Sequence, residues 1–130
     1  TSMSKLIKVA CGIMYNKHNK ILMGLRPLDK GSGGYWEFPG GKEEPNETII
    51  DCLKREWREE LNLEIDVKKM VASYGHNEKY MCMFFVGNIV DEENIKLNVH
   101  DEIRFMKKQD VHNLKLFKED YQFLKKLEDI

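Results

Sequence analysis

This chain of 130 residues lacks several features that would assign it to a membrane, a secretory route or nucleic acid. No stretch approaches the ~18 consecutive apolar residues of a membrane-spanning helix, so we expect no membrane partner. No segment has the charged, apolar and cleavable regions of a signal peptide. The formal net charge is only −1, with no overall basic field, so we expect no nucleic-acid partner.

Cysteine is scarce as well, and histidine shows no pattern. Cys11, Cys52 and Cys82 are an odd number of widely spaced thiols within apolar runs. They predict buried thiols, a reducing cytoplasmic location and no disulfide framework, with Cys52 as a small packing residue. The histidines have no metal-ligand spacing and are predicted to lie in loops or on the surface: His18, His76, His100 and His112. Without a Cys/His cluster, we do not expect a zinc site.

Length and composition predict one domain. A chain of this size can form a single core but not two, and it contains no repeats, linkers or low-complexity segments. We assign the domain to residues 3–130 and interpret Thr1 and Ser2, which precede Met3, as a cloning remnant. The sequence leaves open whether the protein is a monomer or a homodimer.

The hydrophobic pattern predicts strands on both sides of one long helix. Extended segments are expected at Leu6–Tyr15, Lys20–Arg26, Tyr35–Phe38, Leu63–Tyr74, Lys79–Val90 and Glu102–Met106. The long helix is expected to follow an N-cap at Asn46 and to end at Asn62, and a second helix is expected over Glu119–Glu128. This order of elements favours an α+β layered fold.

Three glutamates of the long helix converge on one side. With an advance of about 100° per residue, Glu60 lies roughly 40° to one side of Glu56 and Glu59 roughly 60° to the other. Ile50, Leu53, Trp57 and Leu61 form an apolar stripe beside them, and Asp51, Lys54 and Arg58 form a solvent face opposite. Because the helix already has a solvent face, we interpret the glutamates as a metal site. All-oxygen ligands suit Mg²⁺, for which Mn²⁺ can substitute.

The segment Phe38–Lys42 precedes this helix and is predicted to form a tight turn. Its two glycines, Gly40 and Gly41, permit positive φ and let the backbone approach a ligand closely. Lys42 adds a point charge suited to phosphate. Such turns are common, and the fixed distance to the acidic helix is what makes this one informative.

The segment GGKEEPNETIIDCLKREWREELNL, from Gly40 to Leu63, has the spacing G-x5-E-x7-R-E-x-x-E-E and resembles the Nudix box. The upstream run ILMGLRP…YWEFPGGK resembles the MutT branch of that family, the nucleoside triphosphate pyrophosphohydrolases. The likeness covers most of the chain and is confined to isolated positions after Leu63. It implies the Nudix fold, an α/β/α sandwich with a mixed, curved sheet.

The resemblance also implies a role for each matching residue. The implied metal ligands are the Gly40 carbonyl, Glu56, Glu59 and Glu60. Catalytic roles fall to Glu56, which would orient or deprotonate the attacking water, to Glu59, and to Glu102 as an extra ligand or base. Arg26 and Lys42 would contact the substrate phosphates. Gly41, Glu47 and Arg55 would be structural, with an ion pair between Glu47 and Arg55 bracing the loop against the helix.

Base recognition is implied near the start of the second predicted helix. Asp120, with Glu119 beside it, resembles the position where MutT-like enzymes carry a residue that reads the base edge. A carboxyl there can accept from an exocyclic amine, or donate if burial raises its pKa. Alternatively, both acids simply stabilise a helix N-terminus. Four aromatic residues are candidates for a stacking wall, although most are expected in the core: Tyr35, Trp36, Tyr80 and Phe117.

Two positions depart from the Nudix box. Asn62 stands where the box has glycine, and asparagine is the next best residue for a left-handed helix end. Trp57 stands where the box has a bulky aliphatic residue, on the apolar stripe. Neither change alters an implied ligand, so we expect both to be tolerated.

The implied function is Mg²⁺-dependent hydrolysis of (deoxy)nucleoside triphosphates to nucleoside monophosphate and pyrophosphate. Its purpose would be sanitation of the nucleotide pool, with substrates of the 8-oxo-dGTP or the CTP and modified dCTP type. One alternative keeps the chemistry but changes the substrate to a nucleotide sugar, a dinucleoside polyphosphate or a pterin triphosphate. Another is a non-catalytic nucleotide-binding module, which the intact set of box carboxylates disfavours.

Overall fold

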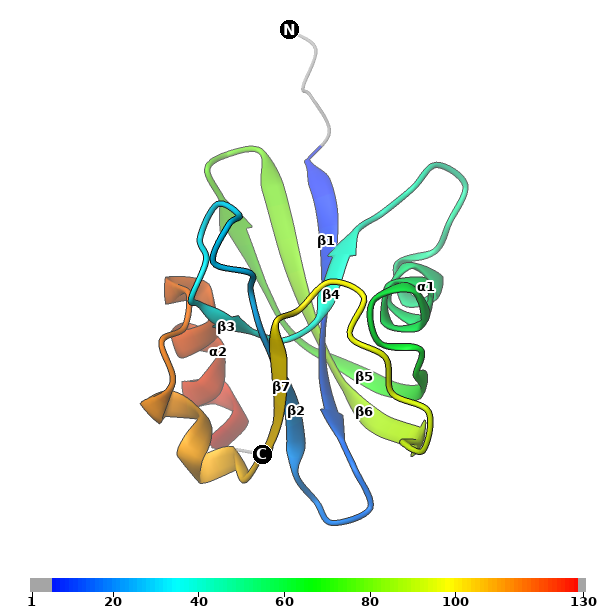
Figure 1. Ribbon diagram of the computed structural model, residues 1–130. Helices are drawn as coiled ribbons and strands as arrows, with labels where there is room; N and C mark the ends of the chain where they lie inside the picture. Colours follow the sequence, from blue (N-terminus) through cyan, green and yellow to red (C-terminus); the bar gives the residue numbers. More distant parts are fainter. Residues whose placement is uncertain (1–5, 129–130) are drawn as a thin grey trace, which may run out of the picture.

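The computed structural model describes residues 6–128 and shows a mixed β-sheet between two helices (Figure 1). Within these residues the strands are β1 (Ile7–Tyr15), β2 (Ile21–Leu25), β3 (Trp36–Glu37), β4 (Gly40–Lys42), β5 (Glu64–His76), β6 (Tyr80–Asp91) and β7 (Glu102–Met106). The helices are α1 (Ile49–Leu61), the 3₁₀ helix η1 (Lys108–Asn113) and α2 (Lys118–Glu128). None of these helices has the length and apolar composition needed to cross a bilayer. The predicted α+β sandwich is confirmed.

Strand β1 lies at the centre of the sheet. The main path runs β3-β2-β1-β6-β5, with β4 paired to β1 and β7 paired to β2. Strands β1 and β6 are parallel, and the other pairs are antiparallel. Cys11 of β1 therefore lies opposite Gly40 of β4 on one side and Phe84 of β6 on the other. This arrangement brings the diglycine segment, the sheet centre and the β5–β6 hairpin together.

Each face of the sheet carries its own hydrophobic core. On one face, Phe123 and Leu124 of α2 pack with Ile13, Phe38 and Phe84. On the other face, α1 packs against β1, β2 and β6 through Cys52, Leu53, Trp57 and Leu61. The two cores explain why the helices lie on opposite sides of the sheet in Figure 1.

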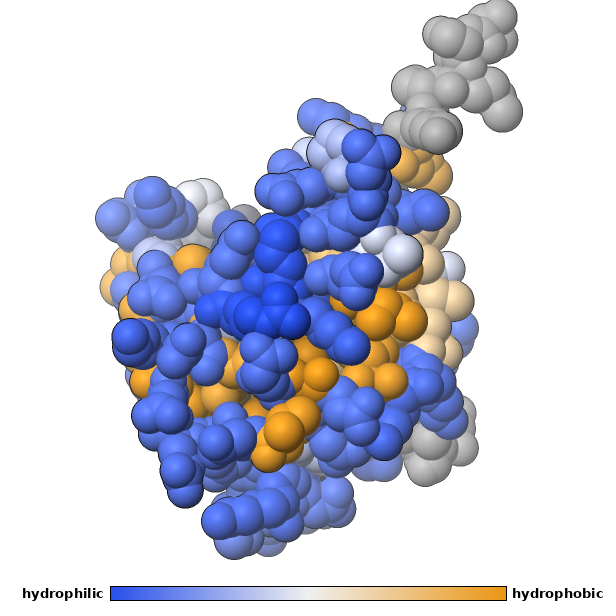
Figure 2. All heavy atoms as spheres, turned by 90° about the vertical axis from the view of Figure 1, so that its right-hand side faces the viewer, coloured by the Kyte–Doolittle hydropathy of each residue, from blue (hydrophilic) through white to orange (hydrophobic). Residues whose placement is uncertain are grey.

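The buried stripe of α1 differs from the prediction at one position. Ile50 was expected on the stripe, yet it is 41% exposed, whereas Cys52 is fully buried. The stripe is rotated toward the side of Cys52, which is the packing residue that the sequence predicted. Seen from the α1 side, the surface is mostly hydrophilic, with apolar patches among the charged residues (Figure 2).

The ends of α1 have clear chemical causes. Thr48, not Asn46, is the N-cap, and its side-chain hydroxyl accepts a hydrogen bond from the Asp51 N–H at 3.1 Å. Asn46 instead adopts a left-handed conformation in the preceding loop, with φ of 66°. At the other end Asn62 has φ of 57°, and its N–H donates to the Arg58 carbonyl at 2.9 Å. The predicted left-handed helix end at Asn62 is confirmed.

The diglycine segment is a strand, not the predicted turn. Residues Gly40–Lys42 form β4 and pair with Val9–Cys11 of β1. Neither glycine has positive φ, because Gly34 alone among the described glycines has it. The requirement for glycine is steric instead: a Cβ on Gly40 would overlap the Ala10 carbonyl oxygen. Trp57 of α1 also holds the segment before β4, because its indole N–H donates a hydrogen bond to the Pro39 carbonyl at 2.9 Å.

Candidate active site

Two adjoining cavities lie where β1, β3 and β4 meet the helices. The first, which we call the acidic cavity, has a volume of about 410 Å³ and is lined by Val9, Cys11, Arg26, Glu37, Phe38, Gly40, Gly41, Lys42, Glu56, Glu59, Glu60 and Val99. The second, the aromatic cavity, has a volume of about 160 Å³ and is lined by Cys11, Glu37, Phe38, His76, Cys82, Phe84, Phe117, Glu119 and Asp120. They share Cys11, Glu37 and Phe38 as lining residues, so the two cavities adjoin at these side chains.

The structure brings the three glutamates of α1 together on the acidic cavity, with Gly40 across from them on β4. Their surroundings differ, because the side chain of Glu59 is 59% exposed whereas that of Glu60 is only 8% exposed. Burial, followed by the hydrogen bond and charge of neighbouring Glu56, raises the pKa of Glu60 above its ordinary value. Burial thus disfavours the charged form of Glu60, and a bound cation would favour it.

Gly41 sets the distance between β4 and α1. A Cβ at this position would collide with the carboxylate of Glu56. Glycine therefore allows that carboxylate to lie directly against the backbone of β4. Any larger residue would displace either the strand or the glutamate.

Arg55 holds this arrangement from the side of α1. Its guanidinium forms two hydrogen bonds to Glu47, at 2.6 and 3.1 Å, and one to Glu56 at 2.8 Å. It also contacts Glu59 at 3.2 Å and the Lys42 carbonyl at 3.2 Å. The structure thus contains the expected ion pair between Glu47 and Arg55, and the fork geometry suits an arginine and not a lysine.

The paired charges shift both pKa values. The hydrogen bond from Arg55 is the main cause that lowers the pKa of Glu47 to about 2. The same bond raises the pKa of Arg55 further above its ordinary value. Both groups therefore stay ionised across the physiological pH range, and the ion pair between Glu47 and Arg55 persists throughout it.

Two cations line the acidic cavity, as the resemblance implied. Arg26 donates to Glu37 Oε1 at 3.0 Å and to the Gly31 carbonyl at 3.2 Å. The Nζ of Lys42 lies 5.1 Å from the ring centroid of Tyr80. Both side chains line the acidic cavity, and their contact with phosphate stays a prediction.

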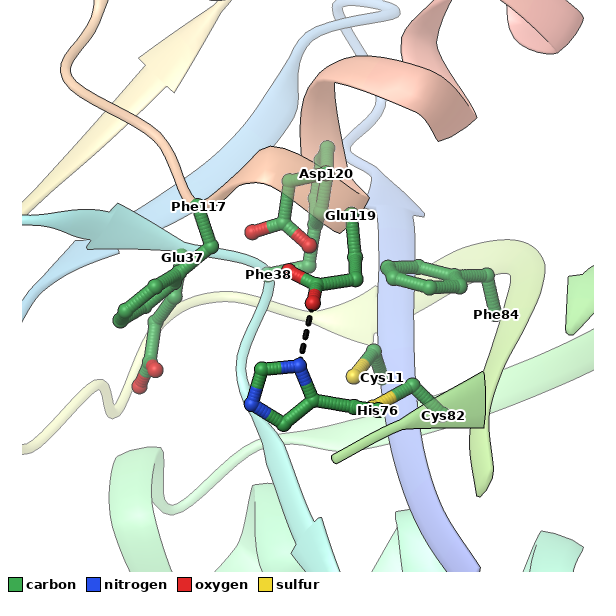
Figure 3. Close-up of a pocket in the computed structure, with 9 residues that line it drawn as sticks. All are labelled: Cys11, Glu37, Phe38, His76, Cys82, Phe84, Phe117, Glu119 and Asp120. Atoms are coloured by element: carbon green, nitrogen blue, oxygen red, sulfur yellow. Dashed lines mark hydrogen bonds and ion pairs between the residues drawn. The ribbon is translucent and has the colours of Figure 1, made fainter. Parts of the chain in front are cut away.

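The aromatic cavity contains both predicted base-reading acids (Figure 3). The Glu119 carboxyl already has a partner in the structure, because it forms a hydrogen bond with His76 Nδ1. Asp120 is 7% exposed, and burial, followed by the charges of Glu37 and Glu119, raises its pKa to about 8. At neutral pH its carboxyl is therefore mostly protonated, and it can both donate and accept a hydrogen bond.

The four aromatic candidates for a stacking wall divide as follows. Phe117 lines the aromatic cavity, and Tyr35 stacks on it with ring centroids 4.8 Å apart. Trp36 is buried in the core on the α2 side. Tyr80 lies against Lys42 and not in the cavity wall. Of the four candidates, Phe117 alone lines the aromatic cavity, and Tyr35 supports it by stacking on its ring.

The structure does not bring Glu102 to either cavity. It lies at the start of β7 opposite Leu25, and its carboxylate pairs with Arg104 at 2.9 Å on the surface. Its side chain is 48% exposed. Its catalytic role stays a prediction to which this geometry adds no support.

Two residues to which the sequence assigned no role lie beside Glu60: Glu37, which lines both cavities, and His100, which contacts Glu37 from behind. Their side chains and that of Glu60 place ligand atoms within 4.8 Å of one another. His100 was predicted to lie in a loop or on the surface; it is in a loop, but it is only 4% exposed. Glu37 lies within the quoted YWEFPGGK run, so that motif contained a signal for it. His100 has no local signal, because the path of the loop before β7 decides its place.

The donor set fits a hard divalent cation. The acidic cavity offers the carboxylates of Glu56, Glu59 and Glu60 and the backbone of Gly40, all of which are oxygen donors. Neither cysteine on the cavity walls is activated as a soft ligand, because burial raises the pKa of both the Cys11 and the Cys82 thiol. The oxygen ligands of the acidic cavity thus suit a hard divalent cation.

The chain belongs to the Nudix family, since the NUDIX domain model matches residues 5–127. The predicted family is thus confirmed. The chain is 38% identical over 73 residues to an 8-oxo-dGTP diphosphatase of Proteus vulgaris, which is 56% of this chain and 65% of that protein. It is 44% identical over 70 residues to a CTP pyrophosphohydrolase of Escherichia coli K12, which is 54% of this chain and 51% of that protein. It thus spans about half to two thirds of the length of these relatives.

Solved structures share the fold over nearly the whole chain. The E. coli ORF135 protein superposes with a TM-score of 0.79 and 28% identity, covering 96% of this chain and 90% of that one. A MutT protein of Methanosarcina mazei Go1 gives a TM-score of 0.81 with 19% identity, covering 98% and 97%. At that identity the second likeness establishes the fold alone.

The lowered pKa of Glu47 predicts how the brace responds to acid. Its carboxylate is favoured in the folded state, so its contribution is present above the unfolded value of about 4.5 and is lost as the pH falls toward about 2. The Glu47→Gln variant should therefore be less stable than the wild type at pH 6, and the difference should shrink steadily below pH 4.5. Thermal unfolding of both proteins from pH 2.5 to 7 measures this. A difference that is constant across that range would contradict the brace.

Proposed function

We propose that this protein is a Mg²⁺-dependent hydrolase that converts (deoxy)nucleoside triphosphates to nucleoside monophosphates and pyrophosphate. The observation that carries the proposal is the junction of an acidic cavity with an aromatic one. The first suits a cation and a polyphosphate, and the second suits a planar base. The names of the relatives, an 8-oxo-dGTP diphosphatase and a CTP pyrophosphohydrolase, support the same class of substrate.

The cation would be held by the carboxylates of Glu56, Glu59 and Glu60 and by the Gly40 carbonyl. When bound there, magnesium would supply charge neutralisation of the phosphates and polarisation of their oxygens. The residues of the chain do the rest. Arg26 and Lys42 bind the remaining phosphate charge, and Arg55 keeps the carboxylate of Glu56 against Gly41.

The reaction needs a water positioned beside an internal phosphorus. Glu56 is our candidate for orienting this water and accepting its proton, because its carboxylate is fixed by Arg55 and lines the cavity. The bond that forms joins the water oxygen to the attacked α- or β-phosphorus. The bond that breaks joins this phosphorus to the oxygen that bridges the α- and β-phosphates, so the products are nucleoside monophosphate and pyrophosphate. Glu102 is the weaker candidate for a base, since it pairs with Arg104 outside the cavity.

Asp120 is our candidate for reading the base. A neutral carboxyl offers one donor and one acceptor, which matches an edge that pairs an exocyclic amine with a ring nitrogen acceptor, as in cytosine. An ionised carboxylate instead accepts from two donors, as a guanine-type edge provides. Substrates of the CTP type and of the 8-oxo-dGTP type both remain within the proposal. Removal of such nucleotides from the pool is the role we infer, in the reducing cytoplasm that three free cysteines favour.

Substitution of the α1 glutamates tests the proposed activity. Glu56→Gln and Glu59→Gln each remove a charge but preserve shape, so each should lower kcat by at least about 100-fold. The assay measures pyrophosphate and monophosphate from a panel of normal and modified (d)NTPs with and without Mg²⁺. Glu64→Gln, which changes an exposed glutamate paired with Arg58, is the matched control and should keep the wild-type rate. Near-normal rates in Glu56→Gln and Glu59→Gln would overturn the assignment of these residues.

The protonation of Asp120 gives a separate prediction. Its pKa is about 8 in the folded chain and about 3.8 when unfolded, so the folded state retains a proton that the unfolded state releases. Stability should therefore fall as the pH rises from about 4 to about 8 and then level off. Asp120→Asn removes this penalty. Because each pKa unit corresponds to about 1.4 kcal/mol, the variant should gain at least about 1 kcal/mol relative to the wild type at pH 9.

Denaturant unfolding at pH 5, 7 and 9 measures that gain. The change Asp29→Asn, in an exposed loop, is the matched control for loss of a carboxyl far from the cavity. If Asp120→Asn behaves like Asp29→Asn at every pH, then Asp120 is ionised in the folded chain.

A further inference from the structure

The loop between β6 and β7 places His100 behind the acidic cavity, against Glu37 and Glu60. This loop is attached to the C-terminal end of α1 by two backbone hydrogen bonds: Lys96 N–H donates to the Leu61 carbonyl and Asn98 N–H to the Glu60 carbonyl, each at 3.0 Å. The side chain of Asn98 also donates to the Glu59 carbonyl at 2.9 Å. These hydrogen bonds fix the loop to the part of α1 that carries the acidic cluster.

The imidazole of His100 has little freedom. Its side chain is fully buried, and a Cβ on Gly24 of β2 would lie only 2.5 Å from its Cδ2 atom. Gly24 thus makes room for the ring. The Nε2 atom lies 2.8 Å from Glu37 Oε2 and 3.8 Å from Glu60 Oε1. In the tautomer with the ring proton on Nε2, His100 donates a hydrogen bond to Glu37 Oε2.

Glu37 transmits this contact to Arg26. One of its carboxylate oxygens accepts from His100, and the other accepts from Arg26 at 3.0 Å. The guanidinium carbon of Arg26 lies 5.7 Å from the ring centroid of Phe117, in the wall of the aromatic cavity. A chain of contacts therefore connects the end of α1 to the Arg26 guanidinium through His100 and Glu37.

We propose that His100 is a positioning residue that fixes the Glu37 carboxylate, and through it the guanidinium of Arg26, for contact with the nucleotide. The proposal rests on the proposed function, which makes Arg26 a phosphate contact. Without the donor of His100, Glu37 loses its buried partner and Arg26 loses the fixed side of its ion pair. The loss falls on binding, because Arg26 holds the substrate and does not take part in the bond change.

A residue that merely fills space at this position would behave differently. Replacement of the ring by an apolar side chain of similar bulk would then change stability but not nucleotide binding. His100→Leu removes the donor and keeps much of the bulk, whereas His100→Gln retains an N–H donor at a reach similar to that of Nε2. His18→Leu, in the exposed β1–β2 turn, is the matched control.

The test is a double-mutant cycle between His100 and Arg26, with CTP and 8-oxo-dGTP as the probes. We expect His100→Leu to raise KM at least tenfold while kcat changes less than about threefold, and His100→Gln to recover most of the loss. Arg26→Ala should raise KM by itself. In the Arg26→Ala background, His100→Leu should add less than twofold, because the two residues act through one contact. His18→Leu should leave both constants unchanged.

Additive effects of His100→Leu and Arg26→Ala would overturn the proposal, as would a His100→Leu protein whose KM is unchanged. If His100→Leu does not fold, His100→Asn, whose shorter side chain withdraws the donor from Glu37, takes its place in the same cycle. If the wild type hydrolyses neither probe, the proposed function has failed, and the cycle is measured as CTP affinity by isothermal titration. Additivity there, or no binding at all, overturns the role of His100 as well.

Discussion

The site depends on the close approach of the Glu56 carboxylate to β4, for which Gly41 leaves room because it has no side chain. The carboxylate of Glu56 occupies the space that a Cβ would fill, and Arg55 fixes it there with hydrogen bonds to Glu47 and Glu56. Neighbouring glutamates on a helix repel one another by a few tenths of a kcal/mol per pair on an exposed surface. Burial of Glu60 adds a separate cost to its charged form and so raises its pKa. Arg55 offsets part of the repulsion between Glu56 and Glu59, and a divalent cation would offset the remaining costs.

The same packing joins the two cavities. Trp57 ties α1 to the Pro39 carbonyl, and Pro39 links β3 to β4. Glu37 and Phe38, immediately before it, line both cavities. A shift of α1 would therefore change the shape of the aromatic cavity as well as that of the acidic cavity. The path through His100 and Glu37 gives a second connection between the two ends.

Much of this fold was predictable from local patterns. The segment Glu102–Met106 and the helix end at Asn62 match the structure, because alternation and a left-handed asparagine are local signals. Thr48 replaced Asn46 as the N-cap because both are good capping residues two positions apart, and only the path of the loop decides between them. Strand β4 was missed because two glycines have low β propensity, and its pairing with β1 is a tertiary effect.

The candidate site was predictable only in part, for a similar reason. The glutamates of α1 share a face by helical geometry, so their convergence followed from spacing. The place of His100 depends on hydrogen bonds between its loop and the end of α1, which no spacing encodes. Glu102 shows the converse: its sequence neighbourhood suggested the site, but its strand register turns it toward Arg104.

The most direct measurement compares Gly41→Ala with Gly75→Ala in the Mg²⁺-dependent hydrolysis of CTP and 8-oxo-dGTP. A Cβ at Gly75 meets nothing within 4 Å, so this control should keep the wild-type rate. A Cβ at Gly41 displaces the Glu56 carboxylate, and a displacement of about 1 Å at a reacting centre can cost about 100-fold in rate. We predict a loss of that order for Gly41→Ala, in a protein that still folds. A Gly41→Ala rate within about twofold of Gly75→Ala would contradict the account.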